Sequence, residues 1–265
     1  MIDIHAHILP GFDDGAATMA EAVEMACQAR ADGIGTIVAT PHILDAAKPH
    51  REKILAGVRE LQARLDEGRI AVRILPGAEI HIGPDVARMA AEGLAMTLCD
   101  AGKYLLLELP LNEMPRYTES VVFDLLSYGI TPVLAHPERN RDLARDPRLV
   151  ESLVDQGCLT QISTGSIRGR FGTEARKAAE TLIKRGLAHI MATDGHGSVH
   201  RRVMMAEARA KVASEHGHDL ALDLTRRVPQ AVIEGRVHDP RGARPVRGGW
   251  RRLTGLKLAP NTPPR

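Results

Sequence analysis

Short apolar runs alternate with longer amphipathic stretches along most of the chain. The apolar runs are bounded by Gly, Pro or Asp, which predicts buried strands. They lie at residues 2–7, 35–40, 70–75, 104–109, 129–135, 159–163 and 188–193. The stretches between them repeat apolar residues every three to four positions, which predicts helices. These are expected at residues 19–31, 53–67, 118–128, 147–156, 173–185, 199–216 and 220–234.

This order of elements predicts the fold class. Strands that alternate with helices favour βαβ units and therefore a parallel sheet. Six or seven such repeats follow one another without a second composition regime, and 265 residues suit a single α/β barrel. We expect one barrel domain over residues 1–235.

Composition narrows the class of protein. Hydrophobic residues make up 44% of the chain but aromatic residues only 3%, so Leu, Ile, Val and Ala must fill the core. The formal net charge of +2 argues against a dedicated nucleic-acid binder. Cys27, Cys99 and Cys158 are odd in number and widely spaced, which favours reduced thiols in a cytoplasmic protein. We expect neither a signal peptide nor membrane insertion, because no apolar run is long enough.

The last thirty residues have a different character. Residues 236–265 carry eight basic side chains among Pro and Gly, with Asp239 as the one acid. This composition predicts a mobile, solvated tail. A second interpretation is that the tail attracts an acidic partner or an anionic membrane surface.

Polar residues recur where the predicted strands end. His5 and His7 lie two apart on the first strand, so their side chains point to one face. Six further residues follow or end later strands: His42, Glu79, Glu108, His136, Asp194 and His196. In parallel α/β barrels this end of the strands carries the active site.

These residue types predict a divalent-metal site. Mixed imidazole and carboxylate ligands suit Mn, Fe, Zn or Co, and a carboxylate such as Glu79 or Glu108 can bridge two ions. Clustered divalent ions polarise phosphoryl groups and supply hydroxide at neutral pH. Asp14 in the first turn is a further candidate ligand, with Asp13 as its competitor and turn capping as the alternative role of either. The alternative for the histidines is an ordinary structural role, which we expect for His81 in a loop.

Other phosphatase and nucleotide-binding chemistries lack their residues. A cysteine-dependent phosphatase needs Arg six positions after its Cys, but Gly33, Leu105 and Thr164 occupy those positions. No Gly-rich loop followed by Lys-Ser/Thr is present. The segment GSIRG at 165–169 is not a nucleophile elbow.

Six motifs together resemble the polymerase and histidinol phosphatase (PHP) superfamily. They are IDIHAHILPGFDDG, ATPH, PGAEI, LLELP, LAHPERN and ATDGH. Their order and spacing are similar to the bacterial tyrosine-protein phosphatases of capsular and exopolysaccharide loci. The resemblance covers about residues 1–235. The chain departs from the family pattern at Gly195 and Gly197, where the family more often has Ala and Asn. Because glycine allows more backbone freedom than these residues, the departures put the local rigidity of this segment in doubt.

The resemblance implies a distorted (β/α)7 barrel that holds three metal ions, usually Mn. It implies nine ligands, namely His5, His7, Asp14, His42, Glu79, Glu108, His136, Asp194 and His196. Arg139 and Arg201 match the family's phosphate-binding arginines, a role that suits the planar guanidinium fork. The alternatives are a surface ion pair for Arg139 and simple solvation for Arg201. His42 or Asp14 is the candidate general acid.

The implied reaction is in-line attack on phosphorus by a metal-bound hydroxide. The implied substrate is a phosphotyrosine protein, specifically a bacterial tyrosine kinase that controls polysaccharide export. Alternatives within the superfamily are a small-molecule phosphatase of the histidinol-phosphate kind and a phosphodiesterase. A metal-dependent amidohydrolase is disfavoured because no lysine ends a strand to form a bridging carbamate. A metal-binding scaffold without catalysis is disfavoured by the complete ligand set.

Overall fold

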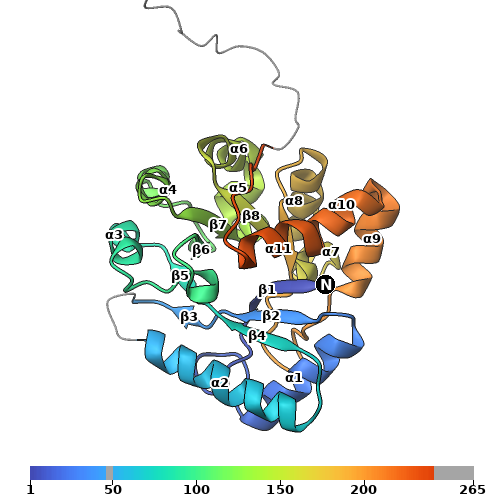
Figure 1. The fold of residues 1–265 in the computed structure, drawn as a ribbon. Helices are drawn as coiled ribbons and strands as arrows, with labels where there is room; N and C mark the ends of the chain where they lie inside the picture. Colours follow the sequence, from blue (N-terminus) through green and yellow to red (C-terminus); the bar gives the residue numbers. More distant parts are fainter. Residues whose placement is uncertain (46–49, 242–265) are drawn as a thin grey trace, which may run out of the picture.

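The structure is a computed structural model that describes residues 1–45 and 50–241. The strands are β1 (Ile2–Ala6), β2 (Thr36–Ala39), β3 (His42–Ile43), β4 (Arg73–Pro76), β5 (Glu79–His81), β6 (Tyr104–Glu108), β7 (Thr131–Ala135), β8 (Leu159–Ser163) and β9 (Ile190–Ala192). The larger α-helices are α1 (Met19–Ala31), α2 (Arg51–Glu67), α4 (Thr118–Ser127), α6 (Pro147–Gln156), α8 (Gly172–Lys184) and α9 (Ala206–His216). The shorter ones are α3 (Val86–Ala91), α5 (Arg141–Arg145), α7 (Thr164–Ile167), α10 (His218–Leu222) and α11 (Val228–Ile233). Figure 1 shows the strands in the middle of the molecule with helices around them.

All of the strand pairs are parallel, as the alternation of strands and helices predicted. One sheet has the order β1-β2-β4, and the other has the order β3-β5-β6-β7-β8-β9. The chain passes from β2 to β3 through Thr40 and Pro41, and from β4 to β5 through Gly77 and Ala78. Each of these two-residue connections leads from a strand of the first sheet directly into a strand of the second, so the two sheets are continuous through β2–β3 and β4–β5.

The two free edges of this arrangement also meet. The Asp194 N–H donates to the His5 carbonyl at 2.8 Å, and the His7 N–H donates to the Gly195 carbonyl at 2.8 Å. Ala6 and Gly195 form a parallel bridge. The residues that follow β9 therefore lie beside the end of β1, and this contact brings the first and last predicted ligands together.

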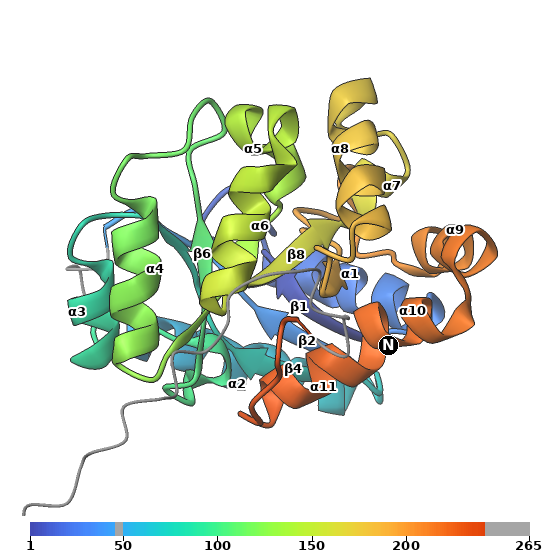
Figure 2. The ribbon, with the colours of Figure 1, turned by 90° about the horizontal axis from the view of Figure 1, so that it is seen from above.

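Alternate strand residues fill two hydrophobic clusters on opposite faces of the strands. Tyr104 and Leu106 of β6 belong to one cluster, together with residues of β1, β7, β8, β9 and α11. Leu105 and Leu107 belong to the other, which includes the buried faces of the surrounding helices. This alternation follows from the two-residue repeat of a strand. Burial on both faces is typical of parallel sheets, and Figure 2 shows helices on the outer side.

Most helix boundaries agree with the sequence prediction within two residues. The α1 helix begins after its N-cap residue Thr18: the Glu21 N–H donates to Thr18 Oγ1 at 3.2 Å, and the Ala17 N–H donates to the Glu21 carboxylate at 3.0 Å. Stretches for which the sequence predicted no helix contain α3, α5 and α7. The helix predicted over 220–234 is divided into α10, a π-helical turn at Asp223–Arg227, and α11.

The helix predicted over 199–216 is wrong in its first turns, because α9 begins at Ala206. The Asp32 carboxylate accepts the N–H groups of Met205 and Ala206 at 2.5 and 2.8 Å and so caps the helix there. Arg201 has a left-handed backbone with φ of +47°, and its carbonyl accepts the His196 N–H at 2.8 Å. Residues 199–205 therefore form a loop that returns Arg201 to the strand ends.

The domain boundary at residue 235 stays a prediction. Most of the predicted tail, from 242 to 265, lies outside the described residues. No helix within residues 1–45 and 50–241 is long and apolar enough to cross a membrane.

Candidate metal centre

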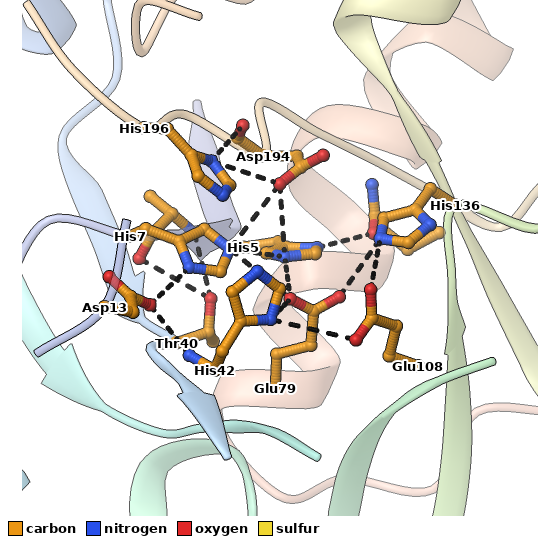
Figure 3. A network of polar contacts seen from close by, with 12 residues as sticks. His5, His7, Asp13, Thr40, His42, Glu79, Glu108, His136, Asp194 and His196 are labelled. Carbon is orange, nitrogen blue, oxygen red and sulfur yellow. Dashed lines mark hydrogen bonds and ion pairs between the residues drawn. The ribbon is translucent and has the colours of Figure 1, made fainter. Parts of the chain in front are cut away.

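Histidines and carboxylates from the whole chain converge at the ends of the strands (Figure 3). Four groups in the described part of the chain have donor atoms within 4.8 Å of one another. They are His7, Asp14, His42 and His196; His5, Glu79 and His136; His5, His7 and Asp194; and His42, Glu79 and Glu108. Together these groups contain all nine residues that the resemblance implied as ligands.

Strand ends position these side chains. His5 lies in β1, His42 begins β3, Glu79 begins β5 and Glu108 ends β6. His136 directly follows β7 and has a left-handed backbone with φ of +31°. Asp194 follows β9 with φ of +51°. Such conformations are disfavoured for residues with a side chain and are common at functional sites.

The segment after β9 is held on both sides. The Gly195 N–H donates to Thr193 Oγ1 at 3.2 Å, and its carbonyl accepts the His7 N–H at 2.8 Å. A Cβ at Gly195 would lie 2.6 Å from a methyl group of Val203. Glycine at position 195 therefore accompanies close packing, and hydrogen bonds hold the backbone there on both sides.

Glu79 lies at the centre of the cluster and is fully buried. Its Oε2 atom is 3.0 Å from His42 Nδ1, 3.2 Å from His5 Nε2 and 3.4 Å from His7 Nε2. The same oxygen has no hydrogen bond of good geometry within the described residues. A buried carboxylate oxygen among three imidazole nitrogens is suited to bind a cation.

Neighbouring acceptors determine which imidazole nitrogens are available. His5 Nδ1 lies 2.8 Å from Gln161 Oε1, and His7 Nδ1 lies 2.7 Å from Asp13 Oδ2. Because both partners are acceptors, each Nδ1 carries a proton, and each ring in its neutral form would present its Nε2 lone pair to a metal ion. The two Nε2 atoms are 3.1 Å apart. Two lone pairs at this distance repel one another unless a cation or a proton lies between them, so the residues fit a metal ion.

The electrostatics of the cluster also favour cations. Burial disfavours charge on Glu79, but His5, His136 and His42 hold the pKa of its carboxyl well below the usual value. Burial likewise opposes ionisation of Asp194, yet the nearby His5 and other cationic groups hold its pKa well below the usual range. Both carboxylates are therefore ionised beside protonated histidines, and a bound cation would supply the same positive charge in place of those protons.

Asp13 and Asp14, the two candidates in the first turn, have different surroundings in the structure. The Asp13 side chain is only 6% exposed and accepts hydrogen bonds from His7 Nδ1, the His42 N–H at 2.8 Å and the Gly15 N–H at 2.9 Å. The Asp14 side chain is 68% exposed, and its Oδ1 lies 3.5 Å from His196 Nε2 and 3.7 Å from His42 Nε2. Asp13 thus orients the histidines, whereas Asp14 faces the cluster from its open side.

The two predicted phosphate-binding arginines meet at one atom. Arg139 Nη1 and Arg201 Nη2 each lie 2.6 Å from Asp194 Oδ2. The Arg139 guanidinium also stacks on the Phe171 ring, with 4.2 Å to the ring centroid, and that of Arg201 lies 5.6 Å from it. Both side chains are partly exposed, so their remaining N–H groups can reach a ligand.

Sequence reasoning missed three parts of this arrangement. Gln161 orients His5, and its polar character within the buried strand β8 was an available signal. Phe171 supports both arginines, for which the sequence offers no signal. The prediction that His81 is a loop residue is wrong, because it lies in β5 with Nδ1 3.4 Å from Glu108 Oε2.

The chain matches known proteins over most of its length. Residues 1–234 match the family model for capsular polysaccharide synthesis, CpsB/CapC. The chain is 39% identical over 226 residues to the tyrosine-protein phosphatase YwqE of Bacillus subtilis, which covers 85% of this chain and 89% of that protein. It is 30% identical over 239 residues to the tyrosine-protein phosphatase CpsB of Streptococcus pneumoniae, which covers 88% of this chain and 98% of that protein.

A solved structure agrees with these matches. The crystal structures of YwqE from Bacillus subtilis and CpsB from Streptococcus pneumoniae, described as metal-dependent tyrosine phosphatases, include a chain that superimposes with a TM-score of 0.85. The sequence identity is 36%, and the superposition covers 89% of this chain and 96% of that one. The chain therefore belongs to the CpsB/CapC family of capsular polysaccharide synthesis proteins.

Proposed function

We propose that this protein is a metal-dependent phosphatase that hydrolyses phosphotyrosine in proteins. The observation that carries the proposal is the convergence of Arg139 and Arg201 on Asp194, at the margin of the histidine and carboxylate cluster. Paired guanidinium groups suit the oxygens of a phosphoryl group. The names of the relatives from Bacillus subtilis and Streptococcus pneumoniae support the same activity.

The proposed cofactor is a set of three divalent ions, with manganese as the first choice and iron, zinc and cobalt as alternatives. The nine residues that would hold them are His5, His7, Asp14, His42, Glu79, Glu108, His136, Asp194 and His196. When bound, such ions polarise the phosphoryl group, provide hydroxide at neutral pH and stabilise the departing oxygen. We also propose that the strands form a distorted (β/α)7 barrel, in which β2 with β3 and β4 with β5 each count as one interrupted strand. The hydrogen bonds between the residues after β9 and the end of β1 support this closure.

The protein's own residues would divide the remaining work. Arg139 and Arg201 would hold two phosphoryl oxygens, while Asp194 keeps the two guanidinium groups aligned. His42 and Asp14 are the candidates to deliver a proton to the leaving oxygen, and their side chains are 25% and 68% exposed. A phenolate is a good leaving group, so the contribution of this proton is expected to be small.

The exposed margin of the site favours a protein substrate. Asp14, His42 and Arg201 are partly open to solvent, so a phosphorylated side chain can approach from outside. The proposed partner is a bacterial tyrosine kinase that acts in polysaccharide export, and the cytoplasmic location stays a prediction. A small-molecule phosphatase of the histidinol-phosphate kind and a phosphodiesterase are the alternatives.

The test compares a phosphotyrosine peptide with histidinol phosphate and a phosphodiester, each with manganese and again after chelation. Hydrolysis of the peptide that chelation abolishes supports the proposal. Hydrolysis of histidinol phosphate or the diester alone would move the substrate to one of the alternatives. Arg139→Ala should lose most of the peptide activity, whereas Arg148→Ala, whose side chain is 80% exposed and pairs with Asp146, should keep it.

A further inference from the structure

A groove beside the metal centre shares Arg139 with the proposed site, and the proposed reaction does not use the rest of its lining. Its volume is about 740 Å³, which is in the range that holds a drug-sized ligand or a short peptide segment. It lies between α5 and α8, and its lining includes Leu111, Arg139, Arg141, Arg145 and Phe171.

Arg139 connects this groove to the proposed site. One side of its guanidinium lies 2.6 Å from Asp194 Oδ2, and the group stacks on Phe171 with 4.2 Å to the ring centroid. Both Arg139 and Phe171 line the groove. A tyrosine whose phosphoryl group is held by Arg139 would therefore have its neighbouring residues within reach of the groove.

The groove has an excess of available positive charge. Arg141 and Arg145 are exposed, and neither side chain has a hydrogen bond or an ion pair within residues 1–45 and 50–241. Each of the two acids of the lining, Glu138 and Glu174, has a partner among the protein's own residues. Glu138 is buried and accepts hydrogen bonds from the Ser163 N–H and Ser166 Oγ at 2.9 and 2.7 Å, and Glu174 lies 3.7 Å from Lys177 Nζ.

We propose that this groove binds the segment beside the phosphotyrosine and selects substrates with acidic residues there. Carboxylates of the substrate would pair with Arg141 and Arg145, and Leu111 offers an apolar contact beside them. The inference rests on the proposed function and adds the chemistry of the substrate to it. Under this proposal the groove affects how tightly a peptide binds and does not change the chemical step at phosphorus.

The test uses two phosphotyrosine peptides of equal length, flanked by Asp and Glu in one and by Lys in the other, with p-nitrophenyl phosphate as a substrate without flanks. Exposed ion pairs contribute about 0.2–1 kcal/mol each. Two such pairs predict that wild-type kcat/KM for the acidic peptide is about twofold to thirtyfold higher, mainly through KM. The difference should decrease in 0.5 M salt.

Three variants locate the effect. Arg141→Glu combined with Arg145→Glu should abolish or reverse the preference and leave turnover of p-nitrophenyl phosphate unchanged. Arg141→Lys combined with Arg145→Lys should retain it, because the charges remain. Arg59→Glu combined with Arg64→Glu, two exposed charge reversals on α2 far along the chain from the groove, is the matched control and should behave as the wild type. Thermal melts check that each variant is folded.

A binding measurement separates this inference from the proposed function. Peptides with the same flanks and a non-hydrolysable phosphonate in place of the phosphate should show the same order of Kd by fluorescence anisotropy. Equal kcat/KM and equal Kd for the two peptides would overturn the groove and leave the phosphatase activity in place. If the wild-type protein hydrolyses neither peptide, the proposed function and this inference both fail.

Discussion

Replacing Asp13 with Asn tests how this protein prepares its metal ligands. Three N–H groups point at the Asp13 carboxylate: His7 Nδ1 and the His42 N–H at Oδ2, and the Gly15 N–H at Oδ1. Burial opposes the charge, but the hydrogen bond from His7 lowers the pKa of Asp13 to about 2, so it is ionised at neutral pH. An Asn amide of the same shape must turn its NH₂ group toward at least one of these donors.

The size of the effect follows from that lost contact. A hydrogen bond to a charged group contributes about 1.5–3 kcal/mol, which corresponds to roughly 10- to 100-fold in an equilibrium constant. Partners that orient metal-binding histidines commonly have effects of about this size on metal affinity. We therefore expect Asp13→Asn to bind manganese about 10- to 100-fold more weakly than the wild type.

The assay is a manganese titration by calorimetry, together with melting temperature as a function of added metal. Stabilisation by metal depends on the ratio of its concentration to Kd, so the variant should need correspondingly more manganese for the same rise. Asp155→Asn, at an exposed position on α6, removes the same charge far from the cluster and should leave both curves unchanged. A manganese Kd for Asp13→Asn within twofold of wild type would refute the orienting role.

Three further predictions concern other parts of the structure. Gly165→Ala would put a Cβ 2.5 Å from the Phe171 ring and so displace the ring on which Arg139 stacks. Inhibition by inorganic phosphate should therefore weaken about tenfold. Gly35→Ala, where a Cβ meets open space, is the control and should leave the inhibition constant unchanged. Burial raises the pKa of the Cys158 thiol to about 12, so iodoacetamide should react with half-buried Cys27 before it reacts with Cys158. Mass spectrometry of timed samples measures the order, and simultaneous labelling of the two cysteines would contradict the prediction. Burial also raises the pKa of Glu138 above the ordinary value of 4.5, so its ionised form destabilises the fold as pH rises above that value. In urea unfolding, Glu138→Gln should therefore gain stability relative to wild type between pH 5 and pH 7.5, and a constant difference would refute the assignment.

The sequence by itself determined the order of the elements and the composition of the candidate site. Short apolar runs bounded by Gly, Pro or Asp mark buried strands locally, so β6, β7 and β8 could be predicted within two residues of their bounds. Parallel strands also place their carboxyl ends at one edge. Residues that are distant in the sequence, such as His5 and Asp194, could therefore be expected to meet there.

Only the tertiary structure decided which neighbours orient and surround those residues. His5 and Gln161 are 156 positions apart, and their contact depends on the register between strands that no local pattern specifies. Asp13 and Asp14 are adjacent and chemically identical, so their separate roles follow from the turn that buries one and exposes the other. The support of Arg139 by Phe171 likewise requires the packing of two distant segments, because side-chain contacts between elements depend on three-dimensional shape.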